Sequence, residues 1–272
     1  MDDQIVALSC LCDDLLKALD HAEDPQRHLS DAAIMTTAVV AALPFRGNWE
    51  QARDLLSHRR YIPPMLGKSR FNRRLHASSE LFLTGFQVLG ELFTQLNTAS
   101  VYVIDSFPIA ACDKIRIPRA RLYQEEVYRG YIASKWRYFD GLRIHLLVTA
   151  AGEPVEVFLA PGADADVRAL SRFAFEVPTG SIVYADSAFT HYAVEELMKE
   201  AGIVLHPIRQ KNSKRPGPPS VAYLQACGRK IVETTGSLIE RLLPKSIHAV
   251  TPQGFELKVV LFVLAVSVSF VM

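Results

Sequence analysis

Two aspartates in this sequence each follow an apolar, β-branched run of the kind that forms buried strands. Asp105 comes after residues 101–104, and Asp186 comes after residues 182–185. A bare charge beside a buried strand is costly, so such a carboxylate needs a partner, for example a metal ion. Taken alone, Asp105 is better explained as a residue that caps its strand, and the rest of the chain must decide between these interpretations.

A third acid makes the chemical interpretation more specific. Glu233 lies on a predicted long helix over 223–243, and Arg229 lies one helical turn before it on the same face. Carboxylates gathered at one edge of a sheet can hold hard divalent cations and leave positions open for water and phosphate. Two such ions about 4 Å apart can activate a hydroxyl and stabilise a departing oxyanion. Three converging acids therefore indicate metal-dependent phosphoryl transfer.

The elements that must position these acids begin near residue 98. The pattern predicts five strands, over residues 101–108, 141–148, 155–160, 181–187 and 203–208. It predicts one helix after the third strand (163–175), one after the fourth (190–201) and two after the fifth (223–243 and 255–271). We expect Pro108 to end the first strand and the basic segment 114–135 to form a loop or an insertion. This order predicts an α/β, ribonuclease H-like fold with a mixed five-stranded sheet and flanking helices. In that fold an acid on the first strand, one after the fourth and one on the last helix converge.

An all-helical module of residues 1–97 is predicted to precede this catalytic domain of residues 98–272. Its most distinctive part is the short basic helix 68–76, which has Phe71 and Leu75 on one face. The cations on this helix are Lys68, Arg70, Arg73 and Arg74. A helix-turn-helix uses such a helix to contact phosphates and base edges. A solvated basic helix packed on its apolar face explains this stretch equally well.

Composition excludes few functions. The chain has 272 residues and a net charge of +1, but no acid occurs between Arg59 and Ala77 or between Glu200 and Glu233. A basic surface can therefore exist within a neutral total. The four cysteines lack metal-ligand spacing. No signal peptide is evident, and the apolar tail 259–272 is short for a bilayer span, so we expect a buried terminal helix and a soluble cytoplasmic protein.

Several segments also resemble one family. They are residues 104–108, 130–135, 138–148, 184–186, 231–235, 246–251 and 254–259. Together they resemble DDE transposases of bacterial insertion sequences, and they are most similar to the insertion sequence 982 family. The resemblance implies that Asp105, Asp186 and Glu233 bind two Mg²⁺ ions, for which Mn²⁺ can substitute. It further implies hydrolysis at terminal inverted repeats of double-stranded DNA and attack of the released 3′-hydroxyl on target DNA.

The resemblance also supplies candidate DNA contacts. Arg229 matches an arginine that related transposases place before the catalytic glutamate, where it can contact phosphate. We expect Lys135 and Arg143 to line the DNA channel, although solvation is the default for each. Arg209 and Lys211 belong to a second basic surface. Because transposases commonly act on paired ends, we expect a homodimer by analogy, associated with the nucleoid when DNA is bound.

One departure and several competing interpretations complete the sequence picture. Gly236 stands where the family pattern usually has Phe, and glycine costs about 1 kcal/mol relative to alanine in a helix interior. We expect the lost aromatic to leave a cavity. Asp164 and Asp166 are expected to cap a helix rather than bind metal. His145 is expected to be a satisfied core histidine rather than a base, and Trp136 to make ordinary packing contacts rather than stack on a base. The alternatives are a decayed remnant, a DNA-binding regulator that needs only residues 1–97, and a nuclease that does not join strands.

Overall fold

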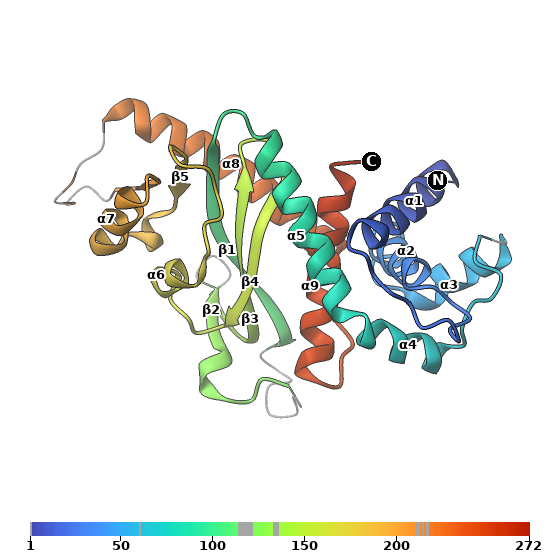
Figure 1. Cartoon of the computed structure of the whole chain (residues 1–272). Helices are drawn as coiled ribbons and strands as arrows, with labels where there is room; N and C mark the ends of the chain where they lie inside the picture. Colours follow the sequence, from blue (N-terminus) through green and yellow to red (C-terminus); the bar gives the residue numbers. More distant parts are fainter. Residues whose placement is uncertain are drawn as a thin grey trace. The chain divides into compact units, whose positions relative to one another are not determined.

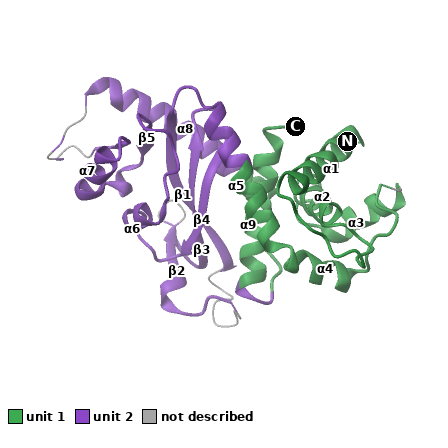
Figure 2. Ribbon diagram, in the orientation of Figure 1, with its two compact units in different colours: residues 1–88, 239–249, 253–272 green, residues 89–238, 250–252 purple. Residues whose placement is uncertain are grey.

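The chain folds into two compact units. The structure is a computed structural model that describes residues 2–59, 61–113, 122–132, 136–209, 213, 215 and 218–272. Unit 1 comprises residues 1–88, 239–249 and 253–272, and unit 2 comprises residues 89–238 and 250–252 (Figure 2). This division differs from the predicted boundary at residues 97 and 98, because the C-terminal segment belongs with the N-terminal helices.

Unit 1 is helical, as its sequence predicts. It contains α1 (Asp2–Ala18), α2 (Asp31–Ala42), α3 (Trp49–His58), α4 (Lys68–Ala77), the first part of α5 (Ser79–Leu96) and α9 (Pro252–Ser269) (Figure 1). The helix α2 is buried along nearly its whole length. It begins at the predicted cap, since the Ser30 hydroxyl accepts a 3.1 Å hydrogen bond from the Ala33 N–H.

The helix α9 explains why the C-terminus joins unit 1. Its apolar residues lie all round the helix and two thirds of its residues are buried, which is the pattern of a core helix. Phe262 of α9 packs so closely on Gly47 that a Cβ there would lie 2.9 Å from the ring, and Gly47 has a φ of 81°. Among the described helices, α9 has the length and hydropathy of a membrane span, but 67% of it is buried within the protein.

Unit 2 is built on a mixed six-stranded sheet. The strands are β1 (Val101–Asp113), β2 (Arg129–Ile132), β3 (Arg137–Thr149), β4 (Pro154–Pro161), β5 (Ile182–Ala185) and β6 (Val204–Pro207). The order is β2-β3-β1-β5-β6, and β4 also pairs with β3. The β1–β3 and β3–β4 pairs are antiparallel, whereas β1–β5 and β5–β6 are parallel. The predicted mixed sheet is confirmed, with β2 as a sixth strand inside the segment that we expected to be a loop or an insertion.

Pro108 does not end β1, which was predicted to stop there. The strand continues to Asp113, and Pro108 lies opposite Arg143 of β3. The reason lies in the other neighbour: β5 pairs with β1 only over Val101–Ile104. Beyond Ile104 that side of β1 has no partner strand among the described residues. A proline, which lacks an N–H, is tolerated at such an edge.

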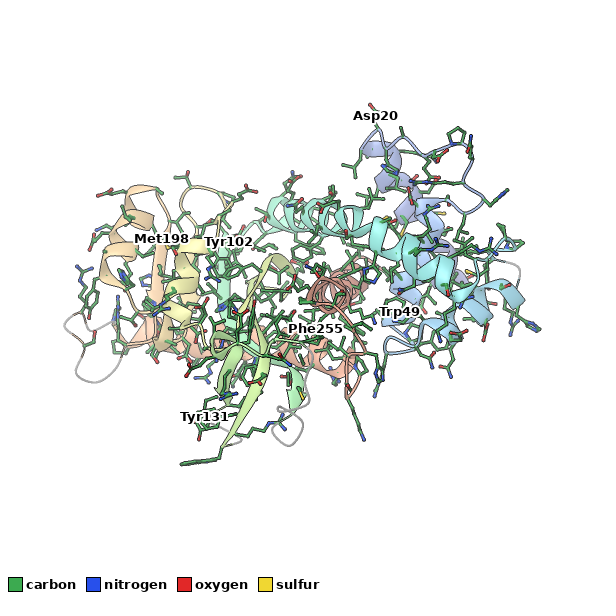
Figure 3. All side chains as sticks on the ribbon, turned by 90° about the horizontal axis from the view of Figure 1, so that it is seen from below. Asp20, Trp49, Tyr102, Tyr131, Met198 and Phe255 are labelled. Carbon is green, nitrogen blue, oxygen red and sulfur yellow. The ribbon has the colours of Figure 1, made fainter. Side chains whose placement is uncertain are left out.

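The helices of unit 2 are α6 (Asp166–Ala169), α7 (Tyr192–Glu200) and most of α8 (Pro219–Leu242). The helix α6 is shorter than the predicted 163–175, because the chain becomes extended at Phe173, whose ring packs edge-on against Phe158 at 4.7 Å. Tyr102 lies in the core of this unit, whereas Tyr131 lies on the β2–β3 hairpin and is partly exposed (Figure 3).

Candidate active site

The two aspartates meet where the parallel pairing of β1 with β5 ends. Ile104 of β1 lies opposite Ala185 of β5, so Asp105 and Asp186, the next residue on each chain, come together. Each carboxylate accepts a hydrogen bond from the following backbone N–H, at 2.7 Å from Ser106 and 2.6 Å from Ser187. Both aspartates line one small pocket. The sequence patterns that end each strand in an acid therefore lead to one site.

The electrostatic surroundings of Asp105 favour a bound cation. The pKa of Asp105 is raised to about 6, chiefly by burial and also by the nearby charges of Asp186 and Asp166, against the lowering effects of the Ser106 N–H and Arg229. Two close carboxylates in a buried place cannot both carry a charge without cost. A divalent cation between them would remove this cost, since its charge favours the ionised form of both groups.

Glu233 is connected to the aspartates through an arginine. The Nε of Arg229 donates a 2.7 Å hydrogen bond to Glu233 Oε1, and its Nη1 lies 4.0 Å from Asp186 Oδ2. Glu233 is half-exposed on α8. The carboxylate oxygens of Asp105, Asp186 and Glu233 are not all within 4.8 Å of one another. Among the described residues, a different group of three meets this distance and is discussed below. The structure thus joins the two aspartates directly and Glu233 through Arg229.

Three contacts hold α8 against the sheet on either side of Glu233. The buried Thr235 hydroxyl donates a 2.7 Å hydrogen bond to the Gly152 carbonyl, in the turn between β3 and β4. The Gln225 side chain donates a 3.0 Å hydrogen bond to the His206 carbonyl of β6. Gly228 lets the helix approach closely, since a Cβ there would lie 3.1 Å from the Val103 side chain. These contacts fix the helix face that carries Arg229 and Glu233.

The space beside Gly236 is occupied by a neighbouring side chain. The glycine is buried, and a Cβ at this position would meet the ring of Phe107 at 3.4 and 3.5 Å, which is ordinary contact. Phe107 of β1 therefore packs beside the glycine, two residues after Asp105. The cavity expected from the missing aromatic is in this way at least partly filled by a side chain of the neighbouring strand.

A fourth acid lies beside the site and was expected only to cap a helix. Asp166 begins α6 but makes no cap; its Oδ1 accepts a 2.6 Å hydrogen bond from the Ser106 hydroxyl and a 3.4 Å one from Arg143. Arg143 also donates to the Ser106 hydroxyl at 3.1 Å. Arg143, predicted to line a DNA channel, is thus engaged inside the unit, with 19% of its side chain exposed.

His145 lies in the core, as expected, but its hydrogen-bonding capacity is not satisfied there. It is fully buried and stacks on Phe158 at 4.8 Å, and neither ring nitrogen has a hydrogen-bond partner among the described residues. Burial, with the charges of Arg143 and Arg172, lowers the pKa of His145 to about 3. The imidazole is therefore neutral. Trp136 differs from the expectation more clearly, since 84% of it is exposed rather than packed.

The predicted DNA contacts in unit 2 have different fates. Arg209 makes a bidentate ion pair with Glu195, at 2.9 and 2.5 Å, and has 16% of its side chain exposed. Lys135 and Lys211 lie outside the described residues. Arg229 remains half-exposed in the pocket. It lies 2.7 Å from Glu233 and 4.0 Å from Asp186.

On α4 the predicted contacts divide between two environments. Lys68, Arg70 and Arg73 are exposed. Arg74, in contrast, points to the buried carboxylate of Asp31, at 2.5 Å, and has 18% of its side chain exposed. Asp31 also pairs with Arg27 at 2.8 Å and with His21 at 2.9 Å. Arg74 therefore has a structural partner, which its position in a basic helix did not indicate.

Two groups of side chains are possible cation sites. His21, Glu23 and Asp31 bring their ligand atoms within 4.8 Å of one another. However, Arg27 and Arg74 already neutralise Asp31, and their positive charges oppose a metal ion there. Asp105 and Asp186 offer hard oxygen ligands, which suit Mg²⁺ or Mn²⁺. The arginine that pairs with Asp186 is Arg229, which is farther away, at 4.0 Å. The aspartate pair therefore fits a divalent metal better.

Comparison with known proteins identifies one family. The family model described as "Transposase DDE domain" matches residues 95–243, a range that contains both aspartates, Arg229 and Glu233. One solved structure, a cryo-EM structure of a piggyBac transposase synaptic complex with hairpin DNA, is similar with a TM-score of 0.45 and 11% identity. The similarity covers 99% of this chain and 73% of that one. No curated protein matches significantly.

Proposed function

Because the chain belongs to the transposase DDE domain family, we propose that it is a DNA transposase of a bacterial insertion sequence. We assign it to the insertion sequence 982 family, on the segments that resemble this family. The reaction is cleavage at the terminal inverted repeats and transfer of the released 3′-hydroxyl to target DNA. The observation that carries the proposal is that Asp105 and Asp186 each follow the last residue of the parallel β1–β5 pairing, Ile104 and Ala185.

Asp105 and Asp186 are the residues that would hold the divalent metal, and Glu233 completes the ligand set. Bound there, Mg²⁺ supplies charge stabilisation for the departing oxygen and lowers the pKa of a water or hydroxyl nucleophile. Arg229 lies between Asp186 and Glu233 and can bind a DNA phosphate through its free N–H groups. Thr235 and Gln225 keep the helix in place, so the cation and the glutamate face the strand ends.

The decisive experiment is a cleavage and strand-transfer assay on DNA that carries the inverted repeats flanking this reading frame. We expect Mg²⁺-dependent nicking and joining that are lost in Asp105→Asn and Asp186→Asn while DNA binding is retained. Glu240→Gln is the matched control, since Glu240 lies two turns beyond Glu233 on α8 and is exposed. If Asp105→Asn nicks the DNA as fast as the parent protein, the active-site assignment is wrong.

The same assay separates the other candidate functions. A nuclease of this fold would nick the DNA but would not join strands, and a DNA-binding regulator or decayed copy would bind without Mg²⁺-dependent cleavage. The packing of Phe107 beside Gly236 favours an active copy, because the helix that carries Glu233 keeps a packed neighbour. We further propose a homodimer that acts in the cytoplasm on two DNA ends, which mass measurement with and without DNA can test.

A further inference from the structure

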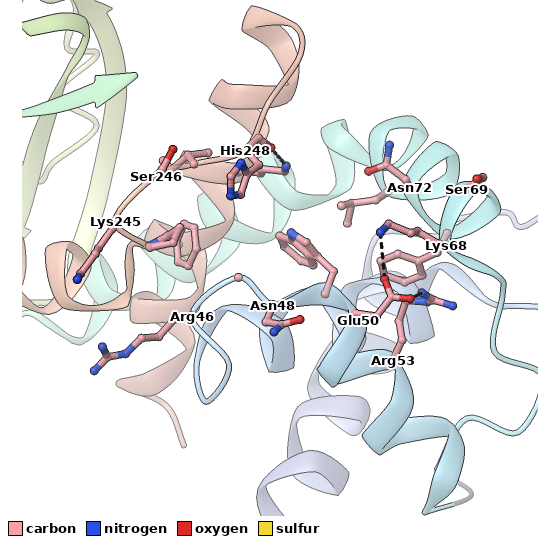
Figure 4. A pocket seen from close by; sticks show the side chains of 18 residues that line it. Arg46, Asn48, Glu50, Arg53, Lys68, Ser69, Asn72, Lys245, Ser246 and His248 are labelled. Atoms are coloured by element: carbon pink, nitrogen blue, oxygen red, sulfur yellow. Dashed lines mark hydrogen bonds and ion pairs between the residues drawn. The ribbon is translucent and has the colours of Figure 1, made fainter. Parts of the chain in front are cut away.

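A large cavity lies in unit 1. Its volume is about 800 Å³, and it is lined by the start of α3, the start of α4, the segment 244–248 and α9 (Figure 4). All of these segments belong to unit 1. The cavity therefore forms only when the C-terminal residues join the N-terminal helices, and the basic helix 68–76 does not reveal it by itself.

The cavity is strongly cationic. Its walls carry one acid, Glu50, and five basic side chains, which are Arg46, Arg53, Lys68, Lys245 and Lys258. Two of these cations are used internally, since Arg53 donates to the Leu66 carbonyl at 2.7 and 3.1 Å, and Lys258 donates to the His248 carbonyl. An excess of positive charge with few internal partners attracts an anion.

The remaining cations lie at opposite ends of the cavity. Figure 4 shows Arg46 and Lys245 at one end and Lys68 at the other. Lys68 has only an exposed pair with Glu50 at 3.5 Å, and such pairs contribute little. No ion pair is found for Arg46 or Lys245 within the described part of the chain. Three cations are thus available to bind a ligand that carries negative charge at both ends.

The cavity is also lined by apolar and aromatic side chains. Trp49 lines it and is partly buried, and Phe71 and Phe262 also face it. Asn72 adds an exposed amide. A flat basic surface suffices for the phosphates of duplex DNA, whereas an aromatic cavity between cations suits a base that has left the helical stack, because bases stack on aromatic rings.

We propose that this cavity, the nucleotide pocket, binds an unpaired nucleotide of a DNA strand. The base lies against Trp49, and the two flanking phosphates bind Lys68 at one end and Lys245 with Arg46 at the other. The choice of DNA rests on the proposed function, since the chain belongs to a transposase family. A free mononucleotide fits less well, because it lacks the second phosphate that cations at both ends of the pocket would bind.

Intrinsic fluorescence tests the nucleotide pocket in the full-length chain. The sequence has two tryptophans, and Trp136 is 84% exposed in unit 2, so Trp136→Phe leaves Trp49 as the reporter. We expect a short oligo(dT) strand, added without divalent metal, to quench Trp49. The double variant Lys68→Gln and Lys245→Gln should bind at least tenfold more weakly. Lys17→Gln, on the exposed surface of α1, is the control and should leave affinity unchanged.

Three results would overturn the inference. The first is unchanged Trp49 fluorescence at saturating oligo(dT), and the second is equal affinity for the double variant and the control. The third is dTMP binding as tight as that of oligo(dT), which would assign the pocket to a free nucleotide. Circular dichroism verifies that the variants fold. Because the titration omits metal and cleavage, failure here is distinct from failure of the proposed function, which the nicking assay measures.

Discussion

Arg229 and Glu233 form a 2.7 Å ion pair one turn apart on α8, and the same guanidinium lies 4.0 Å from Asp186. The acid expected to complete a metal site is thus engaged by a cation of its own helix. Both side chains are about half-exposed, so the pair is weak and exchangeable. A DNA phosphate can compete for Arg229, and this exchange would release Glu233 toward the two aspartates.

Replacement of Arg229 should therefore weaken DNA binding at the catalytic unit. We expect Arg229→Gln to lower affinity for terminal-repeat DNA about tenfold. The slope of log affinity against log salt concentration should become shallower by about one, which corresponds to one released counterion. Lys230→Gln is the matched control, because Lys230 is the next residue on α8, is exposed and lines no part of the acid pocket. Fluorescence anisotropy over a salt series measures both quantities. Equal losses for the two variants would argue against a specific contact by Arg229.

The raised pKa of Asp105 predicts a pH-dependent stability difference. The folded-state pKa is about 6, above the ordinary value of 3.8, so the folded state holds this proton more tightly than the unfolded chain. The resulting stabilisation is fully present below pH 3.8 and is lost as the pH rises through 6, by at most about 3 kcal/mol. Asp105→Asn cannot ionise and keeps its stability over this range. Urea unfolding of both proteins at several pH values gives the difference, and a constant difference would contradict the prediction.

Divalent metal should stabilise the folded protein only when Asp105 is ionised. We expect Mg²⁺ or Mn²⁺ to raise the melting temperature above pH 6 and to lose this effect as the pH falls below 6, because protons compete with the metal. At a metal concentration one hundred times the dissociation constant, the gain is about 2.7 kcal/mol. Chelation with EDTA should reverse it. Glu23→Gln, in the other acidic group, should keep the metal effect, whereas Asp186→Asn should abolish it.

Two glycines of α8 should respond in opposite ways to alanine. Gly236→Ala places its Cβ in ordinary contact with Phe107, so the gain in helix propensity, about 1 kcal/mol, should appear as increased stability. Gly228→Ala gains the same propensity, but its Cβ would lie 3.1 Å from the Val103 side chain. We expect that close contact to cancel or reverse the gain. Urea midpoints of the two variants provide the comparison, and equal stabilisation of both would refute the packing described for Gly228.

Neighbouring arginines of α4 should also separate stability from DNA binding. Arg74→Ala removes one of three partners of the buried Asp31 carboxylate and should destabilise unit 1 by about 2 kcal/mol. Arg73→Ala changes an exposed residue and should alter stability by less than about 0.5 kcal/mol, while lowering DNA affinity. Thermal unfolding and anisotropy, measured on both variants, test this division. Similar stability losses would mean that the pairing with Asp31 contributes little.

Much of this arrangement could be predicted from local sequence. The β-branched runs before Asp105 and Asp186 mark two strands, and a spacing of four residues places Arg229 and Glu233 on one helix face. Long-range pairing could not be read in this way. Asp166 joins Ser106 across 60 positions, and Arg74 joins Asp31 across 43, and neither pair leaves a periodic signal. Pro108 failed as a strand end because the short length of β5, which a local pattern does not show, leaves that part of β1 at an edge.

The position of α9 has a consequence for how the protein is made. Unit 1 includes residues 253–272, so during translation the helices before residue 89 cannot complete their unit until α9 has been made. Chaperones have time to bind this intermediate before it closes. Loss of α9 would therefore also damage the N-terminal helices of unit 1. For the same reason, we expect a fragment of residues 1–97 to aggregate instead of serving as an independent DNA-binding module.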